Sequence, residues 1–480
     1  MKRKKEKRKA SRNIGGKLVT LLQLILSAGL AAKIVINGMF PAKYLLLIVL
    51  GLILLFEICF GLQFVKNKMK IVGILLSLVI SAGSVLGVYA MSSLEQLLAS
   101  VAGGGEYKTD SMIVVVRADD PAESIEDTSD YPFAIQTRID QKNNNLMLEE
   151  LETQFGDELN IKEYDTVVEE ARALLAKDVD AAIYNMSYET LVEDEIKGYL
   201  DQVKILYQYD IKTELQMSSD DQSVEEPFHI YISGIDVYGD IDENSRSDVN
   251  MIMTVNPVTK KILLTNTPRD YYVPIPGVTD GMNDKLTHAG LYGIDASIST
   301  LEQLYGIDIT YYARVNFTSV EEIVDALGGI VVWSDNEFDV GNIHYDQGYN
   351  YLEGYPALMF ARERESFLDG DNQRGKNQQA VIEGVLDKVM SPAILTKANH
   401  IIASVADNVE TNMSQKEMTK FINMQLKDGA EWEIESVAVE GMSQELPCYS
   451  LPGEAYAVTV PDYDTVNKAS MLMSEVMGGN

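Results

Sequence analysis

Three apolar runs follow one another in the middle of the chain: FHIYIS (Phe228–Ser233), VNMIMTV (Val249–Val255) and KILLTN (Lys261–Asn266). Each has strand length and is rich in residues that favour strands. Helical and strand patterns then alternate: a helix at Ile298–Tyr305, a strand at Tyr311–Asn316, a helix at Val320–Leu327, a strand at Ile330–Trp333, and helices at Pro356–Arg364 and Arg374–Met390. This alternation predicts an α/β domain with a mixed central sheet flanked by helices.

A smaller α/β unit is expected before this domain, within residues 92–217. Ser111–Arg117 and Ala181–Asn185 have the composition of strands, and Tyr164–Lys177 has helical periodicity. The acidic run SSDDQSVEE, residues 218–226, is typical of a linker. We therefore expect an accessory domain at 92–217, a main domain at 227–450 and a C-terminal tail at 451–480.

Three apolar stretches stand near the start of the chain, at Lys17–Ile36, Tyr44–Val65 and Ile71–Met91. Each approaches the about 20 residues that cross a bilayer as a helix. The leading residues 1–16 and the second connection, Lys66–Lys70, are basic, which predicts that both lie in the cytoplasm. Residues 17–91 are thus expected to form three transmembrane helices, with everything after residue 91 outside the cell.

The charge of the chain is divided unevenly between its two parts. Residues 1–70 carry 14 basic and 2 acidic residues, whereas the remainder carries 26 basic and 70 acidic residues. A body this acidic would repel nucleic acid, because nucleic-acid binding depends on neutralising phosphates. The two cysteines, Cys59 and Cys448, and the four histidines show no zinc-ligand spacing.

Arginine is scarce in the acidic part and is concentrated beside carboxylates and one glutamine. Five of the nine arginines after residue 91 share this setting: Arg246, Arg269, Arg362, Arg364 and Arg374. The guanidinium group is planar, always charged, and matches phosphate oxygens two at a time. Arginines with aspartates therefore indicate a site for a polyphosphate together with a metal ion.

Asp236 ends one predicted strand, and Arg246 and Asp248 open the next. Residues two apart on a strand share a face, so Arg246 and Asp248 should point the same way. Two carboxylates at neighbouring strand ends suit Mg²⁺, which keeps waters and shares phosphate oxygens. The alternative is a pair of solvated turn aspartates beside a surface arginine.

Arg269 follows the strand KILLTN and Pro268, at a strand end where sites of α/β proteins commonly form. A local salt bridge with Asp270 is an equally good interpretation. Lys285 offers another cation, although a surface position is favoured for it.

The helix predicted at Arg374–Met390 carries an apolar stripe of Val381, Ile382, Val385, Leu386 and Val389. Helical steps backward from this stripe reach Gln378 and Arg374. Both should lie on the buried face near the helix N-terminus, which attracts anions. With Arg362 and Arg364 on the preceding helix, they predict a phosphate site. An ordinary buried ion-pair network is the alternative.

These residues lie in a set of motifs that resembles the LytR–CpsA–Psr family. The motifs are GIDVYG, RSDVNMIMTVNP, KKILLTNTPRDYYVPIPG, DKLTHAG, VDALGGI, ALMFARERESFLDGD and QRGKNQQ, in order between residues 227 and 390. The three spans and the intervening α/β unit are similar to the capsule-associated CpsA (Wzg) branch.

The resemblance implies an enzyme of the Gram-positive cell envelope. It would move a glycopolymer, such as capsular polysaccharide, from undecaprenyl pyrophosphate to peptidoglycan, form a phosphodiester and release polyprenyl phosphate. Asp236 and Asp248 would hold Mg²⁺, with Mn²⁺ as the alternative. The pyrophosphate and head group would contact seven residues: Arg246, Arg269, Lys285, Arg362, Arg364, Arg374 and Gln378. Arg269, Arg362, Arg364 and Arg374 would also act in catalysis. Family members often carry an arginine two residues after the first aspartate, where this chain has Tyr238.

Asp371 is the candidate general base because it stands beside Arg374 at the predicted helix start. It could equally be a supporting residue behind the reacting groups. Three other functions stay open at this point: a transcriptional regulator acting through the basic tail, a lipid carrier for capsule assembly proteins, and a lipid pyrophosphatase.

Overall fold

The computed structural model describes residues 14–65, 67–103, 107–214, 224–235, 244–367, 370–390, 409–453 and 455–479. The chain divides into two compact units, Met1–Ala99 with Lys416–Ala430 and Ser100–Gln415 with Glu431–Asn480. Asp236, residues 218–223 of the linker expected at 218–226, and residues 1–13 of the basic tail lie outside the described part.

The first unit contains the three predicted apolar segments as helices α1 (Ile14–Asn37), α2 (Ala42–Leu62) and α3 (Asn67–Gly103), with α13 (Gln415–Asp428). α1, α2 and α3 are long and apolar enough to cross a membrane. Helix α3 continues well past Met91, because the following sequence SSLEQLLASVA still favours a helix. Lys33 of α1 pairs with Glu95 of α3, so its charge has a protein partner.

The accessory module (residues 107–214) has a five-stranded sheet in the order β3-β2-β4-β1-β5. Its strands are β1 (Tyr107–Arg117), β2 (Pro132–Gln136), β3 (Asn160–Tyr164), β4 (Ala181–Asn185) and β5 (Val203–Glu214). Its helices are α4 (Gln141–Phe155), α5 (Val167–Ala176) and α6 (Glu189–Glu195). Ile113 and Val115 pack into one core while Met112 and Val114 pack into another. The run Met112–Val116 within β1 is therefore apolar without interruption, because both faces of this part of the strand are covered.

The main module (residues 224–480 without Lys416–Ala430) is built on a six-stranded mixed sheet in the order β16-β11-β6-β7-β8-β17. These strands are β16 (Val409–Thr411), β11 (Tyr311–Val315), β6 (Phe228–Ile235), β7 (Ser247–Asn256), β8 (Lys261–Thr267) and β17 (Glu433–Ala438). β6, β7 and β8 pair antiparallel, whereas β11 is parallel to β6 and β17 is parallel to β8. The predicted mixed α/β class is confirmed.

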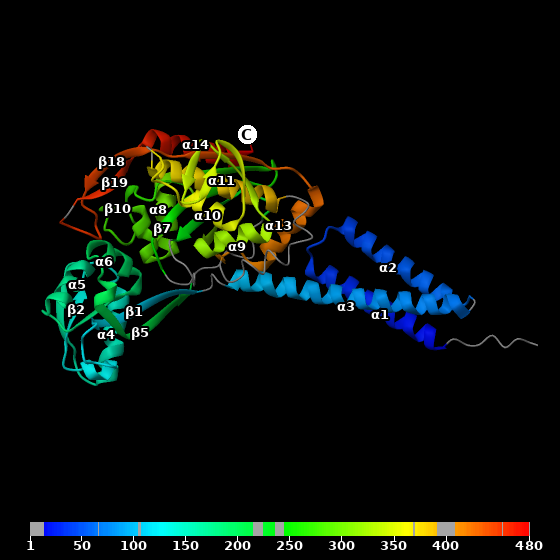
Figure 1. Ribbon diagram of the computed structural model, residues 1–480, viewed down its shortest axis with the longest axis horizontal. Coiled ribbons are helices and arrows are strands. Elements are labelled where there is room, and N and C mark those ends of the chain that lie inside the picture. The colour runs from blue at the N-terminus through cyan, green and yellow to red at the C-terminus, as the bar shows by residue number, and fades with distance from the viewer. Residues whose placement is uncertain are drawn as a thin grey trace, which may run out of the picture. The chain divides into compact units, whose positions relative to one another are not determined.

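Helices cover this sheet on both faces (Figure 1). One layer contains α8 (Ile294–Tyr305) and α14 (Tyr463–Gly478), and the other contains α9 (Phe317–Leu327), α10 (Gly354–Arg362) and α11 (Gly370–Val389). Side chains alternate along each strand, so Tyr231 and Ile252 pack with α8 and α14. The adjacent Ile232 and Met253 line a cavity on the opposite face.

Residues 451–480 were expected to be a tail, but their described part forms β19 (Tyr456–Pro461) and α14. Val466, Ala469 and Met473 of α14 are buried in the core beside α8, which makes this segment part of the main module. The packing partners of α14 in α8 lie far away along the chain, so local sequence does not reveal that this helix belongs to the core.

The remaining elements are short and connect the larger ones. They are β9 (Tyr272–Pro274), β10 (Asn283–Lys285), α7 (Leu286–Ala289), β12 (Ile330–Ser334), β13 (Phe338–Val340), β14 (Ile343–Tyr345), β15 (Gly348–Leu352) and β18 (Gly441–Leu446). Short 3₁₀ turns span Ile125–Thr128, Met186–Tyr188, Leu200–Gln202 and Gly290–Tyr292.

Candidate active site

The pairing of three strands brings the predicted site residues to one edge of the main sheet. Ile235 at the end of β6 is opposite Ser247 at the start of β7, and Thr267 at the end of β8 is opposite Asn250. Arg246 and Asp248 therefore lie beside the turn that carries Arg269. Antiparallel pairing explains this convergence, since the start of one strand meets the end of its neighbour.

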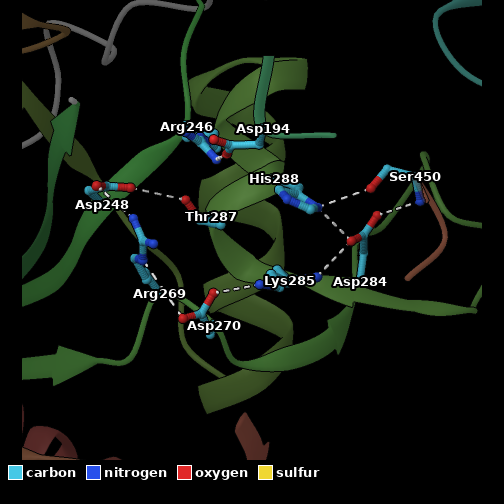
Figure 2. Close-up of polar contacts among 10 residues, drawn as sticks. All are labelled: Asp194, Arg246, Asp248, Arg269, Asp270, Asp284, Lys285, Thr287, His288 and Ser450. Carbon is cyan, nitrogen blue, oxygen red and sulfur yellow. Dashed lines mark hydrogen bonds and ion pairs between the residues drawn. The ribbon is translucent and has the colours of Figure 1, made fainter. Parts of the chain in front are cut away.

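Ion pairs orient the side chains at this edge (Figure 2). Arg269 Nη1 donates to Asp248 Oδ2 at 2.8 Å, and Thr287 Oγ1 donates to Asp248 Oδ1 at 3.3 Å. Asp270 approaches Arg269 Nε at 3.7 Å and Lys285 Nζ at 3.2 Å. The local contact between Arg269 and Asp270 is thus present, but the pair with Asp248 is shorter.

The same cations keep Asp270 ionised. Burial by itself raises the pKa of Asp270, but Lys285 and Arg269 more than offset this effect and hold the pKa below its ordinary value. Arg246 has a partner that the sequence did not indicate. Its Nη1 donates to Oδ2 of Asp194, at the end of α6 in the accessory module, at 2.5 Å (Figure 2).

Helix α11 contributes Arg374 and Gln378, as predicted. It begins at Gly370, earlier than expected, so Arg374 lies in its second turn. A Cβ atom on Gly375 would come within 2.2 Å of the Asn266 side chain, and glycine therefore allows α11 to approach the end of β8 closely. Three polar residues of α11 that were not predicted, Gln373, Asn377 and Gln379, are buried.

Two of these buried residues fix the helix in place. Asn377 donates to the carbonyl of Phe360 at 3.1 Å, and Gln379 donates to the carbonyls of Leu264 at 3.1 Å and Val437 at 2.7 Å. α11 is thereby tied to α10, β8 and β17. This anchoring sets the position of Arg374 and Gln378, which are half-buried and face the cavity.

A cavity of about 600 Å³ lies between the main sheet and the layer of α9, α10 and α11. Its lining contains five arginines, Arg246, Arg269, Arg362, Arg364 and Arg374, with the two carboxylates of Asp194 and Asp248. The rest of the lining is almost entirely apolar. These residues include Ile232, Met253, Val315, Val320, Ile323, Leu358, Val381, Ile382, Val385 and Leu386.

The cavity therefore has two chemically different parts. The predicted stripe on α11 belongs to the apolar part, because Val381, Ile382, Val385 and Leu386 all line it, and Val381 and Val385 also pack beside α9 and α10. Arg362 ends α10, since Glu363 adopts an extended conformation and accepts a hydrogen bond from the Ser366 N–H at 2.7 Å. The arrangement can hold an anionic head group and an apolar chain in one space.

Asp248 offers hard oxygen ligands beside the arginines, which fits a cation that keeps waters and shares phosphate oxygens. Among the described residues, no group of three or more His, Cys, Asp and Glu side chains is placed to enclose a metal. Asp236, the second expected ligand, lies outside the described residues. The described carboxylate is therefore compatible with an open Mg²⁺ site that is shared with substrate.

Two further predicted site residues, Lys285 and Asp371, are not among the described residues of the cavity lining. Lys285 pairs with Asp270, which in turn pairs with Arg269 of the lining. Asp371 belongs to the first turn of α11, but its side chain lies outside the described part.

The motif DKLTHAG forms a buried polar cluster that supports the turn after β9. Nδ1 of His288 lies 2.7 Å from Asp284 Oδ1 and 3.0 Å from Ser450 Oγ. The Ser450 N–H donates to Asp284 Oδ2 at 2.9 Å. Although these are the residue types of a hydrolase triad, serine and aspartate share one ring nitrogen, so a relay through the imidazole is absent from this cluster.

Comparison with known sequences gives a family match over much of the chain. The LytR_cpsA_psr family model matches residues 194–468, which is more than half of the chain. The chain belongs to the LytR–CpsA–Psr family. The match includes every arginine of the cavity and also Asp194.

Named relatives in this family match a shorter region. The chain is 37% identical over 197 residues to a polyisoprenyl-teichoic acid–peptidoglycan teichoic acid transferase TagU of Bacillus cereus (strain AH820). It is 36% identical over 197 residues to the protein of the same name from Enterococcus faecalis (strain ATCC 700802 / V583). Each alignment covers 41% of this chain and 64% of the relative. The chain thus spans somewhat under two thirds of the length of these LytR–CpsA–Psr relatives.

Solved structures also resemble part of the chain. The crystal structure of B. subtilis TagV has 25% sequence identity and a TM-score of 0.46, and the match covers 53% of this chain and 98% of that one. A structure described as TagT bound to LI-WTA has 24% identity and a TM-score of 0.43, with 55% and 99% covered. The family assignment rests on the sequence model.

Proposed function

We propose that this LytR–CpsA–Psr protein transfers a polyprenyl-pyrophosphate-linked glycopolymer to peptidoglycan. The proposal rests on one observation, a cavity that has arginines on one part of its wall and aliphatic side chains on the rest. A polyprenyl pyrophosphate has the same division, with two phosphates at one end and a long hydrocarbon chain. The names of the TagU relatives support the same type of donor and acceptor.

The arginines would bind the pyrophosphate. Arg246, Arg269 and Arg374 come from a strand start, a turn and a helix, so they can reach different oxygens of one group. Arg362 and Arg364 follow one another closely at the end of α10 and are exposed, which places them where a polymer head group would enter. Five guanidinium groups against two carboxylates leave the lining positive inside an acidic body.

The aliphatic part would hold the polyprenyl chain. Ile382 and Leu386 of α11 face this space together with Val320 and Ile323 of α9 and Met253 of β7. Burial of apolar surface stabilises binding by about 25 cal/mol per Å² removed from water. The tail therefore supplies affinity, and the arginines set the position of the phosphates.

The reaction would be a phosphoryl transfer. A hydroxyl oxygen of peptidoglycan forms a bond to the phosphorus nearer the glycopolymer, and the bond from that phosphorus to the bridging oxygen breaks. Polyprenyl phosphate leaves with the electron pair, and the hydroxyl proton passes to a base, for which Asp371 is the proposed residue. Charge on the transferred group and on the leaving oxygen is stabilised by the guanidinium groups, as phosphoryl transfer requires.

Asp248, with Asp236, would hold Mg²⁺ or Mn²⁺ at this end of the cavity. A bound divalent cation would supply further positive charge against the pyrophosphate oxygens. The three apolar helices would keep the protein in the cell membrane, with the N-terminus in the cytoplasm and the main module outside, where lipid-linked polymer and peptidoglycan meet. Capsular polysaccharide is the polymer proposed for this chain, on the basis of its resemblance to the CpsA branch.

The test is transfer by the full chain in lipid nanodiscs, supplied with a labelled polyprenyl-pyrophosphate oligosaccharide and peptidoglycan oligomers. The proposal predicts label linked to peptidoglycan and release of polyprenyl phosphate in equal amount. Label released as free oligosaccharide phosphate would instead identify a pyrophosphatase. Tight binding of the donor without any product would identify a carrier.

A further inference from the structure

The accessory module and the main module share one hydrophobic core. Tyr184 and Tyr188 of the accessory module lie in the same buried cluster as Leu291 and Tyr449 of the main module. The ring centroids of Tyr188 and Tyr292 are 6.3 Å apart. A continuous core of this kind fixes the two modules against one another, unlike a contact through a polar linker.

Buried polar contacts fix the orientation of this junction. Asn244 Nδ2 donates to Asp110 Oδ1 at 2.6 Å, and Asn244 stands just before the strand that carries the cavity residues. Lys108 Nζ donates to the carbonyl of Tyr292 at 2.5 Å, and Ser187 Oγ donates to the carbonyl of Leu291 at 3.3 Å. Hydrogen bonds require specific distances and angles, so they set one relative arrangement.

The junction brings one accessory side chain into the cavity lining. Asp194, at the end of α6, accepts the hydrogen bond of Arg246 at 2.5 Å and also pairs with Lys197 at 3.2 Å. Burial raises the pKa of Asp194, but the hydrogen bond and charge of Arg246 outweigh it, so the pKa lies below the ordinary value. Asp194 is therefore a carboxylate at neutral pH.

We propose that the accessory module completes the anion site, with Asp194 as a positioning residue that orients Arg246 toward the pyrophosphate of the donor. This inference rests on the proposed function and adds a role for the accessory module in it. Asp194 touches Arg246 and acts through it.

The geometry of the contact lets Asp194 orient Arg246 without preventing Arg246 from binding phosphate. Only Nη1 of Arg246 donates to Asp194 among the described contacts, and a guanidinium has five N–H groups, so others can reach phosphate oxygens. Lys197 partly neutralises the negative charge of Asp194, which weakens the repulsion between Asp194 and a bound anion. The Arg246 side chain is 22% exposed, against 46% for Asp194, so the arginine is the more enclosed of the pair.

Holding a long side chain in its binding geometry before the ligand arrives reduces the entropy lost on binding. The usual size of this effect for one immobilised side chain corresponds to about a three- to tenfold change in affinity. Asp194→Asn should therefore weaken binding of polyprenyl pyrophosphate by about this factor. Asp194→Glu keeps the carboxylate and should recover most of the loss.

The experiment measures the Kd of a fluorescent polyprenyl pyrophosphate for the full chain in nanodiscs. The variants are Asp194→Asn, Asp194→Glu, and Asp201→Asn as a matched control on the exposed surface of the same module. Transfer kinetics are measured in parallel. The expected result is a raised Kd and KM for Asp194→Asn with a smaller change in kcat, recovery by Asp194→Glu, and no change for Asp201→Asn.

An unchanged or tighter Kd for Asp194→Asn, with binding by the wild type intact, would overturn the positioning role and leave the proposed function in place. Equal losses in Asp194→Asn and Asp194→Glu together with a lowered melting temperature would also overturn it, because the contact would then be structural. A wild-type chain that binds no polyprenyl pyrophosphate would overturn the proposed function and this inference with it.

Discussion

Arg269 is the arginine whose role can be worked out in most detail from its contacts. Its side chain is 20% exposed and lies 2.8 Å from Asp248, which is 13% exposed. Arg269→Ala would leave Asp248 with the Thr287 hydroxyl and remove the cation from a largely enclosed pair. Breaking a buried pair costs several kcal/mol and breaking an exposed pair under about 1 kcal/mol, so a loss of about 1–2 kcal/mol in stability is expected here.

The expected effect on activity is larger than the effect on stability. Removing one donor that stabilises developing charge costs about 3 kcal/mol, which corresponds to roughly a hundredfold fall in kcat/KM. Arg269→Lys keeps the positive charge but loses the planar guanidinium group, so its activity should lie between those of the wild type and Arg269→Ala. The assay is transfer of labelled oligosaccharide to peptidoglycan oligomers by the full chain in nanodiscs.

Arg172→Ala is the matched control, because Arg172 is an exposed arginine on α5 outside the cavity lining. This variant should keep wild-type stability and activity. If Arg269→Ala remains folded and retains transfer within about threefold of the wild type, the assignment of Arg269 to the phosphate site is refuted.

Three other changes test separate parts of the account. Ile382→Trp should fill the apolar space and weaken binding of polyprenyl pyrophosphate at least tenfold in calorimetry, while binding of inorganic pyrophosphate stays unchanged. Equal losses for both ligands would show a general distortion of the cavity. Chelation by EDTA should stop transfer, and added Mg²⁺ or Mn²⁺ should restore it in the wild type but not in the Asp236→Ala/Asp248→Ala variant; full activity in EDTA would remove the metal from the mechanism. Burial raises the pKa of Asp140 from 3.8 to about 6, and Asp110 adds to the shift. Between pH 3.8 and about 6 the folded state keeps a proton on Asp140 that the unfolded state has lost. The free energy of unfolding therefore falls as pH rises through this range, and it stays lower above pH 6. Asp140→Asn should therefore raise the free energy of unfolding at pH 7.5 by at most about 3 kcal/mol, and by less at pH 4.5, with a matching rise in melting temperature. A difference between variant and wild type that does not change with pH would contradict this.

Much of the main sheet could be predicted from local sequence. β6, β7 and β8 each carry a run of apolar residues that fits a strand buried on both faces. β3 and β5 were not predicted, because most of their residues are polar or only partly buried and their patterns are weak. α14 was also missed as part of the core, since its partner α8 is distant along the chain and local periodicity does not reveal a packing partner.

The site shows the same division between local and long-range information. Arg374 and Gln378 could be placed together because helical spacing relates them directly. Arg246 and Arg269 could be expected near the strand ends, where the pairing of β6, β7 and β8 then brings them together. Asp194 carried no signal, because only the packing of two modules brings it to Arg246. The aliphatic wall combines residues from β7, α9, α10 and α11, so it exists only in three dimensions.

The cavity behind the arginines, and not the apolar N-terminal helices, should hold the polyprenyl chain. The most direct measurement is photo-crosslinking of the full chain in nanodiscs with a polyprenyl pyrophosphate that carries a photoreactive group in its tail, followed by mapping of the adducts by mass spectrometry. Adducts are expected on Ile382 and Leu386 of α11, and an excess of unlabelled polyprenyl pyrophosphate should remove them. Adducts confined to α1, α2 and α3, with none on α11, would contradict this expectation.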